Sequence, residues 1–306
     1  MPEGIKNFTF NLLEDMKNKY SEIPSDDENL ISVFDKIRQL YGDKFIFLID
    51  EWDCVFRFHK GEKREQALFL SFLKHFFKDR NYVELVYMTG ILPIKKYNTG
   101  SALNMFKEYT ILNPGLTAPY FGFTDQEVTL LCENTAMDKI ELGEWYGGYL
   151  LSGVGKMYNP CSVKDALEGK VCSDYWNNTG GYTELEEYIT MDFDGLIESV
   201  ANLFTGKSEA VGVLGFLNDW DSFRSKNEIL TALIHMGYLT YSNGKVSIPN
   251  KEVRIEFSKT IKKMSWATVP KLLKQSKDLL NAVLNQEEAK VCLLYTSPSP
   301  RDRSLS

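Results

Sequence analysis

The spacing of apolar residues predicts helices and strands in the N-terminal part of the chain. A helix-like stretch runs from Phe8 to Tyr20, and apolar residues at helical spacing predict a second helix from Leu30 to Leu40. The continuous apolar run Phe45–Ile49 has the length of a β-strand, and it predicts a strand buried on both faces of a parallel sheet. Gly42 and Asp43 separate the second helix from this strand.

A helix and a second strand follow the first strand. The helix is indicated by one apolar face, which consists of Leu68, Phe69, Phe72, Leu73, Phe76 and Phe77. The run VELVYMTG, which ends at Gly90, predicts the second strand. Strand, helix and strand form a right-handed crossover with parallel strands, and open sheets of this kind place their chemistry at the carboxyl ends of the strands. Those ends carry Asp50 and Thr89.

The later part of the chain has a different pattern. Short helices, Thr124–Glu133 and Tyr182–Tyr188, alternate with turns rich in Gly, Pro and Asn, which predicts a helical second domain. A further helix is expected from Glu228 to Met236. The segments GYLTY and KVSI flank Asn243-Gly244, a strong hairpin signal. A helix followed by a hairpin indicates a winged helix.

Composition excludes several classes of protein. With 35 Lys and Arg against 42 Asp and Glu, the net charge of −7 disfavours a protein whose main task is to grip nucleic acid. No apolar run approaches the roughly 20 residues of a membrane helix, and the start of the chain lacks a signal-peptide pattern. A cytoplasmic protein without membrane partners is therefore expected. The five cysteines form no Cys-x-x-Cys pair, so neither a zinc site nor a disulfide framework is indicated.

Two adjacent carboxylates, Asp50 and Glu51, follow the first predicted strand in KFIFLIDEWD. Carboxylates in such a position hold Mg²⁺ or polarise an attacking water in nucleotide hydrolases. Thr89, at the end of the neighbouring strand, is a candidate to contact a γ-phosphate through its hydroxyl. The competing interpretations are a solvent-exposed strand end for the carboxylates and a turn or cap residue for Thr89.

Nine segments occur in one order, and together they carry a family resemblance. They are KFIFLIDEWD, YMTGILPIKKY, SALNMF, YFGFTDQEV, WYGGY, YNPCSV, DYWNNTG, GYLTY and IPNKEV. From about Phe8 to about Lys263 the chain resembles the bacterial AAA-ATPase-like family, P-loop proteins often fused to a C-terminal restriction-endonuclease-like nuclease domain. The resemblance implies that Asp50 and Glu51 are the Walker B pair and that Thr89 lies in the sensor region. It also implies ATP and Mg²⁺ as cofactors of the intact protein.

The chain departs from the family pattern at its front, at Gly147 and at Cys161, where Trp or another residue is common. Family members carry a strand, a Gly-rich phosphate loop and a helix before the Walker B strand, and none of these is found here, so an N-terminally truncated fragment is expected. Gly147 stands in WYGGY where the family usually has Asp. The segment Ala201–Ser208 satisfies a loose phosphate-loop pattern, but helical apolar spacing precedes Gly206, so we expect a helix end there.

The expected fold class is α/β, an incomplete P-loop NTPase parallel sheet followed by a helical lid and a winged-helix-like module. The expected boundaries are 1–123 for the partial ATPase core, 124–205 for the lid, 206–264 for the winged-helix-like module and 265–291 for a helical linker. Residues 292–306 resemble a translated sequencing adapter and are expected to be an artefact.

Three functional hypotheses follow. In the first, the intact protein hydrolyses ATP, with Asp50 holding Mg²⁺, Glu51 orienting water and Thr89 near the γ-phosphate, and this chain alone is inactive. In the second, it is a nucleotide-switched winged-helix interaction module without turnover, with a protein partner favoured because Glu228–Met236 is poor in Lys and Arg. The basic residues Lys251, Arg254, Lys259, Lys262 and Lys263 keep nucleic acid open as a partner. In the third, the chain is an inactive relic.

Overall fold

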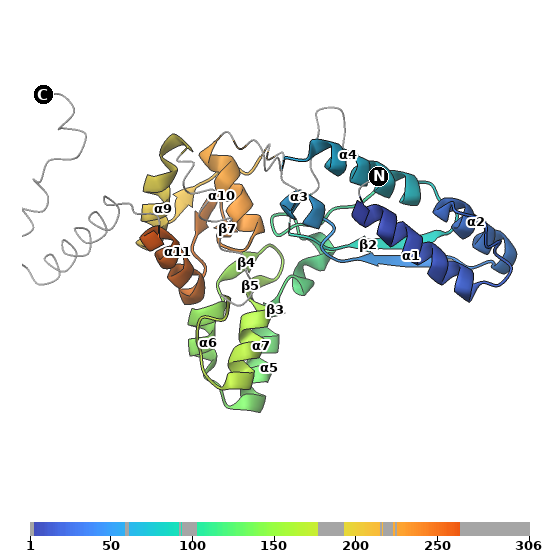
Figure 1. The fold of residues 1–306 in the computed structure, drawn as a ribbon. Helices are drawn as coiled ribbons and strands as arrows, with labels where there is room; N and C mark the ends of the chain where they lie inside the picture. The colour runs from blue at the N-terminus through green and yellow to red at the C-terminus, as the bar shows by residue number, and fades with distance from the viewer. Residues whose placement is uncertain are drawn as a thin grey trace, which may run out of the picture. The chain divides into compact units, whose positions relative to one another are not determined.

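A computed structural model describes residues 3–58, 61–91, 93, 103–176, 193–214, 216, 223 and 225–263. The described residues belong to two compact units, Met1–Thr110 with Leu214–Arg224 and Ile111–Val213 with Ser225–Ser306. In Figure 1 the helices and strands of the first unit run from blue to cyan, and those of the second run from green to red. The predicted helix Tyr182–Tyr188, the predicted linker 265–291 and segment 292–306 lie outside the described residues.

The first unit contains the predicted strand–helix–strand crossover. Its elements are α1 (Glu3–Lys19), α2 (Leu30–Tyr41), β1 (Phe45–Ile49), α3 (Cys54–Phe58), α4 (Lys63–Phe77) and β2 (Val83–Met88). The side chain of Asn29 caps the start of α2 by accepting the backbone N–H groups of Ile31 and Ser32. Gly42 ends α2 in the left-handed conformation, at φ 76°, which a residue with a side chain seldom adopts. These signals explain why α2 stops just before β1.

The two strands of the first unit pair in parallel, as predicted. Ile46 lies opposite Leu85, and Leu48 lies opposite Tyr87. These four residues share one face of the sheet, and their exposed fractions are 61% for Ile46, 75% for Leu48, 51% for Leu85 and 56% for Tyr87. The prediction that Phe45–Ile49 is buried on both faces is therefore wrong for this structure. Among the described residues, the helices that pack on the sheet cover only the opposite face.

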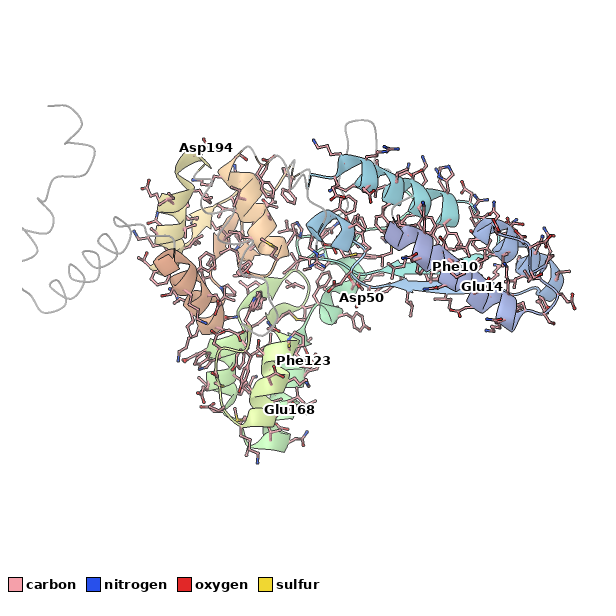
Figure 2. All side chains as sticks on the ribbon, in the orientation of Figure 1. Phe10, Glu14, Asp50, Phe123, Glu168 and Asp194 are labelled. Carbon is pink, nitrogen blue, oxygen red and sulfur yellow. The ribbon has the colours of Figure 1, made fainter. Side chains whose placement is uncertain are left out.

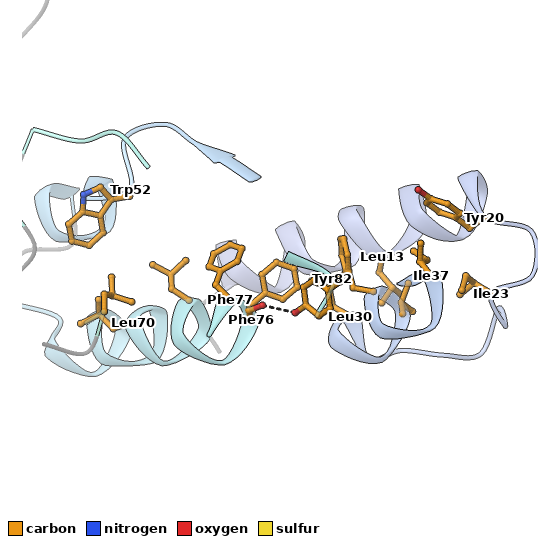
Figure 3. Packing of buried hydrophobic residues seen from close by; sticks show 14 residues of the cluster. Leu13, Tyr20, Ile23, Leu30, Ile37, Trp52, Leu70, Phe76, Phe77 and Tyr82 are labelled. Carbon is orange, nitrogen blue, oxygen red and sulfur yellow. Dashed lines mark hydrogen bonds between the residues drawn. The ribbon is translucent and has the colours of Figure 1, made fainter. Parts of the chain in front are cut away.

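The covered face forms an aromatic core. Phe45 and Phe47 of β1 contact Phe34 of α2, and Phe47 also contacts Phe76 of α4, with ring centroids between 4.6 and 5.6 Å apart. The core runs from Tyr20 and Ile23 at one end to Trp52 at the other (Figure 3). Burying rings of this size contributes most of the apolar area that such a core removes from water. Helices α1, α2 and α4 thereby hold β1 and β2 in place.

The second unit contains two small antiparallel sheets and the helices around them. Its elements are η1 (Gly115–Tyr120), β3 (Phe123–Thr124), α5 (Asp125–Thr135), α6 (Lys139–Tyr146), β4 (Tyr149–Leu151), β5 (Gly155–Tyr158), α7 (Pro160–Gly169), η3 (Phe193–Gly195), α9 (Leu196–Phe204), β6 (Glu209–Ala210), α10 (Lys226–His235), β7 (Thr240–Ser242), β8 (Lys245–Ser247) and α11 (Lys251–Lys263). The strand orders are β3-β5-β4 and β6-β8-β7. A backbone N–H of Leu150 donates to the Thr240 hydroxyl at 2.8 Å and joins the two sheets.

The short motifs of the later sequence meet inside the second unit. A Cβ atom on Gly148 would lie 2.1 Å from the carbonyl oxygen of Pro249, so WYGGY needs glycine where IPNKEV passes over it. Asn250 donates to the Gly147 carbonyl at 2.9 Å and caps α11 by accepting the N–H of Val253. Glu252 accepts the backbone N–H groups of DYW at Tyr175 and Trp176. These motifs therefore build the packing of the second unit.

The predicted hairpin is present. Strands β7 and β8 are antiparallel, and Asn243 and Gly244 both have positive φ between them, as a tight hairpin turn requires. The preceding helix α10 buries six successive residues, from Ile229 to Ile234. Helices α9, α10 and α11 lie together around the β6-β8-β7 sheet (Figure 1).

The segment Ala201–Ser208 is the end of a helix, as predicted. Helix α9 runs to Phe204, and Gly206 follows in the left-handed conformation, at φ 90°. The N–H groups of Gly206 and Lys207 donate to the carbonyls of Leu203 and Asn202, the pattern of a helix C-terminus. A phosphate-binding loop instead follows a strand and opens a helix. The loose motif is therefore not a nucleotide loop.

Within the described ranges, none of the helices combines the length and the apolar character that a membrane crossing demands.

Candidate functional site

The structure brings Asp50 and Thr89 together. Asp50 follows β1, Thr89 follows β2, and the Thr89 hydroxyl donates a hydrogen bond to Oδ1 of Asp50. The backbone N–H of Glu51 donates to the same oxygen at 3.0 Å. Figure 2 shows Asp50 where its strand ends. Both hydrogen bonds go to Oδ1, and the Asp50 residue is exposed.

Backbone hydrogen bonds extend the parallel pairing past the ends of both strands. The N–H of Thr89 donates to the Ile49 carbonyl at 2.9 Å, and the N–H of Trp52 donates to the Thr89 carbonyl at 2.9 Å. Thr89 is thus hydrogen-bonded through its backbone to Ile49 and Trp52, which come before and after Asp50 in the chain. This pairing places the Thr89 hydroxyl within reach of the Asp50 carboxylate.

The side chain of Glu51 has a partner of its own. The residue has a φ of 50°, which is uncommon for a residue with a side chain and occurs often at functional sites. Its carboxylate accepts a hydrogen bond from Nη2 of Arg57 at 3.0 Å. Asp50 and Glu51 therefore have separate partners, Thr89 for the first and Arg57 for the second.

Arg57 and Asp53 belong to the same cluster, and the sequence analysis did not identify them. They stand four residues apart on and just before α3, with 3.5 Å between Nε of Arg57 and Oδ2 of Asp53. The Asp53 side chain is fully buried, whereas the Glu51 side chain is 61% exposed. The signal that would have found them is an acid and a base at helical spacing in DCVFR, directly after the strand.

Gly90 allows this cluster to form. A Cβ atom at Gly90 would lie 2.6 Å from Cδ1 of Trp52 and 2.7 Å from Oδ1 of Asp53, closer than real contacts allow. Trp52 is itself buried and packs on Phe56, with ring centroids 5.4 Å apart. The end of β2 therefore needs a residue without a side chain at this point.

The charge of the cluster favours a cation. Among the described residues, Asp50, Glu51 and Asp53 bring three carboxylates to the guanidinium of Arg57, so these four side chains together carry two net negative charges. An exposed carboxylate beside a hydroxyl suits Mg²⁺, which keeps several of its waters and takes one or two carboxylates from a protein. Within the described part of the chain, no group of three or more His, Cys, Asp or Glu side chains is arranged to hold a metal ion. A Mg²⁺ ion at this place would therefore take Asp50 as its carboxylate ligand and keep most of its waters.

Comparisons with known proteins add one relative. The chain is 25% identical over 170 residues to an uncharacterized protein in the vnfD 5′ region of Azotobacter chroococcum mcd 1. The match covers 53% of this chain and 33% of that protein, so the aligned part spans about a third of the relative's length. No protein-family model matches the chain. No solved structure matches it either.

Proposed function

We propose that this chain belongs to an AAA-ATPase-like protein of the cytoplasm that binds and hydrolyses ATP with Mg²⁺, and that it supplies the Walker B side of the site. The observation that carries the proposal is the hydrogen bond between Thr89 and Asp50 at the carboxyl ends of two parallel strands. Open parallel sheets hold their ligands at that edge. The proposal includes the P-loop sheet, helical lid and winged-helix-like module expected from the sequence.

Each predicted residue has a part in this proposal. Asp50 would hold Mg²⁺, while Thr89 keeps the carboxylate oriented and would offer its hydroxyl to the γ-phosphate. Glu51 orients the attacking water. Mg²⁺ would supply the positive charge that offsets the phosphate oxygens. The β- and γ-phosphates need backbone amides and a lysine, which a phosphate loop provides in such enzymes.

Manganese, a paramagnetic probe for Mg²⁺ sites, tests the metal role of Asp50. We expect Mn²⁺ to broaden the amide NMR signals of Asp50, Glu51, Thr89 and Gly90 before those of other residues, and Asp50→Asn to abolish this preference. Asp35→Asn, which removes the same charge from α2, should leave the broadening intact. Broadening that is unselective, or that survives in Asp50→Asn, would show that Asp50 is not the metal site.

A nucleotide titration tests whether this chain supplies only the Walker B side of the site. Because this chain presents carboxylates and no phosphate loop before β1, calorimetric titration of ATP with Mg²⁺ should give no heat of binding. Affinity in the micromolar range would mean that the chain holds the phosphates by itself. A polypeptide that joins the chain to a phosphate loop should hydrolyse ATP and lose that activity in Asp50→Asn.

The second candidate is an interaction module without turnover. The helix α10 and the β6-β8-β7 sheet give it the outline of a winged helix. Three basic residues of α11 are engaged inside the unit: Lys251 lies 4.2 Å from the Trp145 ring centroid, Arg254 donates to the Phe204 carbonyl, and Lys259 pairs with Glu256. This favours a protein partner over nucleic acid. Salt-dependent DNA binding that is lost in Lys251→Glu would reverse the preference.

A further inference from the structure

Arg57 contacts two carboxylates that differ in burial. Its Nε lies 3.5 Å from the fully buried Asp53, and its Nη2 lies 3.0 Å from Glu51, whose side chain is 61% exposed. Both contacts belong to the turn that connects β1 with α3. One guanidinium therefore joins an enclosed carboxylate to an accessible one.

The two contacts differ in strength for that reason. A buried ion pair is costly to break, because separation leaves an uncompensated charge in a poorly solvated place. An exposed pair contributes little, since water replaces the lost partner. Arg57 therefore stays with Asp53 while its contact with Glu51 opens and closes at small cost. The guanidinium fork suits this arrangement, because different nitrogens serve the two carboxylates.

We propose that Arg57 is a positioning residue that stores Glu51 away from Asp50 and releases it when a divalent cation binds at Asp50. The inference rests on the proposed function of Asp50. In the stored position the Glu51 carboxylate faces Arg57, and Asp50 is held by Thr89. A cation at Asp50 attracts the Glu51 carboxylate, which is one residue away and exposed to solvent. Glu51 then joins the cation site, where a water-orienting carboxylate is needed.

Mn²⁺ affinity tests whether Arg57 holds Glu51 away from the cation site. Replacing Arg57 alone would remove the guanidinium beside the buried Asp53 carboxylate, so the variant is the double substitution Asp53→Asn with Arg57→Gln, which keeps the net charge and replaces the pair by two amides. Freed from Arg57, Glu51 should tighten Mn²⁺ binding by about two- to fivefold, the factor that corresponds to an exposed ion pair. Adding Glu51→Gln to this variant should remove the whole gain.

The matched control is Lys44→Gln with Glu84→Gln. This pair lies at the other end of the same two strands, with 2.7 Å between Nζ and Oε2, and its removal also keeps the net charge. It should leave the Mn²⁺ affinity unchanged. The proposal is overturned if Asp53→Asn with Arg57→Gln fails to tighten binding, or if the gain persists without Glu51. Thermal unfolding of each variant verifies that it is folded.

A metal-free measurement separates this inference from the metal role of Asp50. Hydrogen exchange at the Arg57 side-chain N–H groups should be several-fold faster in Glu51→Ala than in the wild type, because Nη2 loses its acceptor. If exchange is faster in Glu51→Ala but Mn²⁺ does not bind at Asp50, the contact between Arg57 and Glu51 is real, and the proposed function and the release step are refuted. Unchanged exchange in Glu51→Ala would overturn storage by Arg57 whatever Mn²⁺ does.

Discussion

Thr89 donates a hydrogen bond to Asp50 although 39 positions separate the two residues in the chain. Parallel pairing of β1 with β2 brings them side by side, and the Thr89 backbone is hydrogen-bonded to both Ile49 and Trp52. The hydroxyl therefore holds Oδ1 of Asp50 from a fixed position. Hydrogen bonds to ionised groups are among the stronger ones in proteins, so the orientation of this carboxylate depends on Thr89.

Substitutions at Thr89 test that dependence. Thr89→Val keeps the shape of the side chain and removes the donor, so Mn²⁺ binding at Asp50 should weaken by about threefold or more. Thr89→Ser retains a hydroxyl and should bind Mn²⁺ within about twofold of the wild type. Calorimetric or EPR titration measures both. Equal affinity in Thr89→Val and the wild type would mean that the hydrogen bond does not orient Asp50.

Gly90→Ala should destabilise the first unit. The new methyl group would meet Trp52 and Asp53 at distances below 3.0 Å, and both side chains are buried, so the cluster must shift. Forcing a methyl group into such a site costs about 1–3 kcal/mol. Gly4→Ala is the control, because nothing lies within 4 Å of that position and alanine suits the first turn of α1. Urea unfolding should show a lower free energy of unfolding for Gly90→Ala and no decrease for Gly4→Ala.

The sequence allowed the elements around this site to be predicted, but not all of its members. Apolar runs and helical spacing located β1, β2 and α4 between them, because those patterns follow from which side chains a core buries, whereas the short helix α3 was not predicted. Adjacent carboxylates after a strand drew attention to Asp50 and Glu51. Arg57 was missed although DCVFR places an acid and a base at helical spacing directly after the strand. Gly90 was missed because its importance comes from close packing on Trp52, which leaves no pattern in the sequence.

The burial of β1 was the point at which the pattern misled. An all-apolar strand predicts that other segments bury both faces of the strand. The face that carries Phe45 and Phe47 is indeed packed against Phe34 and Phe76. The other face, with Ile46 and Leu48, stays exposed in the described structure. The amino-acid composition of a strand shows which of its side chains could be buried. Whether a face is buried also depends on which other segments pack against it.

Substitutions on the two faces of β1 should therefore differ in cost. Leu48 is 75% exposed, so Leu48→Thr should change the free energy of unfolding by no more than about 0.5 kcal/mol. Phe47 packs on Phe34, Phe76 and Phe77, and Phe47→Ala should cost about 2 kcal/mol or more. Denaturant unfolding of both variants measures the difference. A large loss for Leu48→Thr would show that the outer face is covered in solution.

Glu256 of α11 predicts a pH dependence for the second unit. Burial, with help from the neighbouring Asp174, raises the pKa of Glu256 to about 7 from an ordinary value of 4.5, while Lys259 opposes the rise. The folded state therefore keeps a proton that the unfolded chain has lost between these two values. Stability falls as pH rises through this window, because the unfolded state binds fewer protons there. The loss of folding stability caused by ionising Glu256 is absent below about pH 4.5 and complete above about pH 7.

The variant Glu256→Gln isolates this effect, because glutamine stays neutral throughout and retains polar atoms for Lys259. The quantity to measure is the free energy of unfolding of the wild type minus that of Glu256→Gln, at several pH values between about 4 and about 8. This difference should decrease as pH rises from about 4.5 to about 7 and then become constant. Glu133→Gln makes the same substitution at an exposed position of α5 and controls for the loss of one carboxylate. A difference that stays constant or increases with pH would show that Glu256 does not keep its proton in the folded protein.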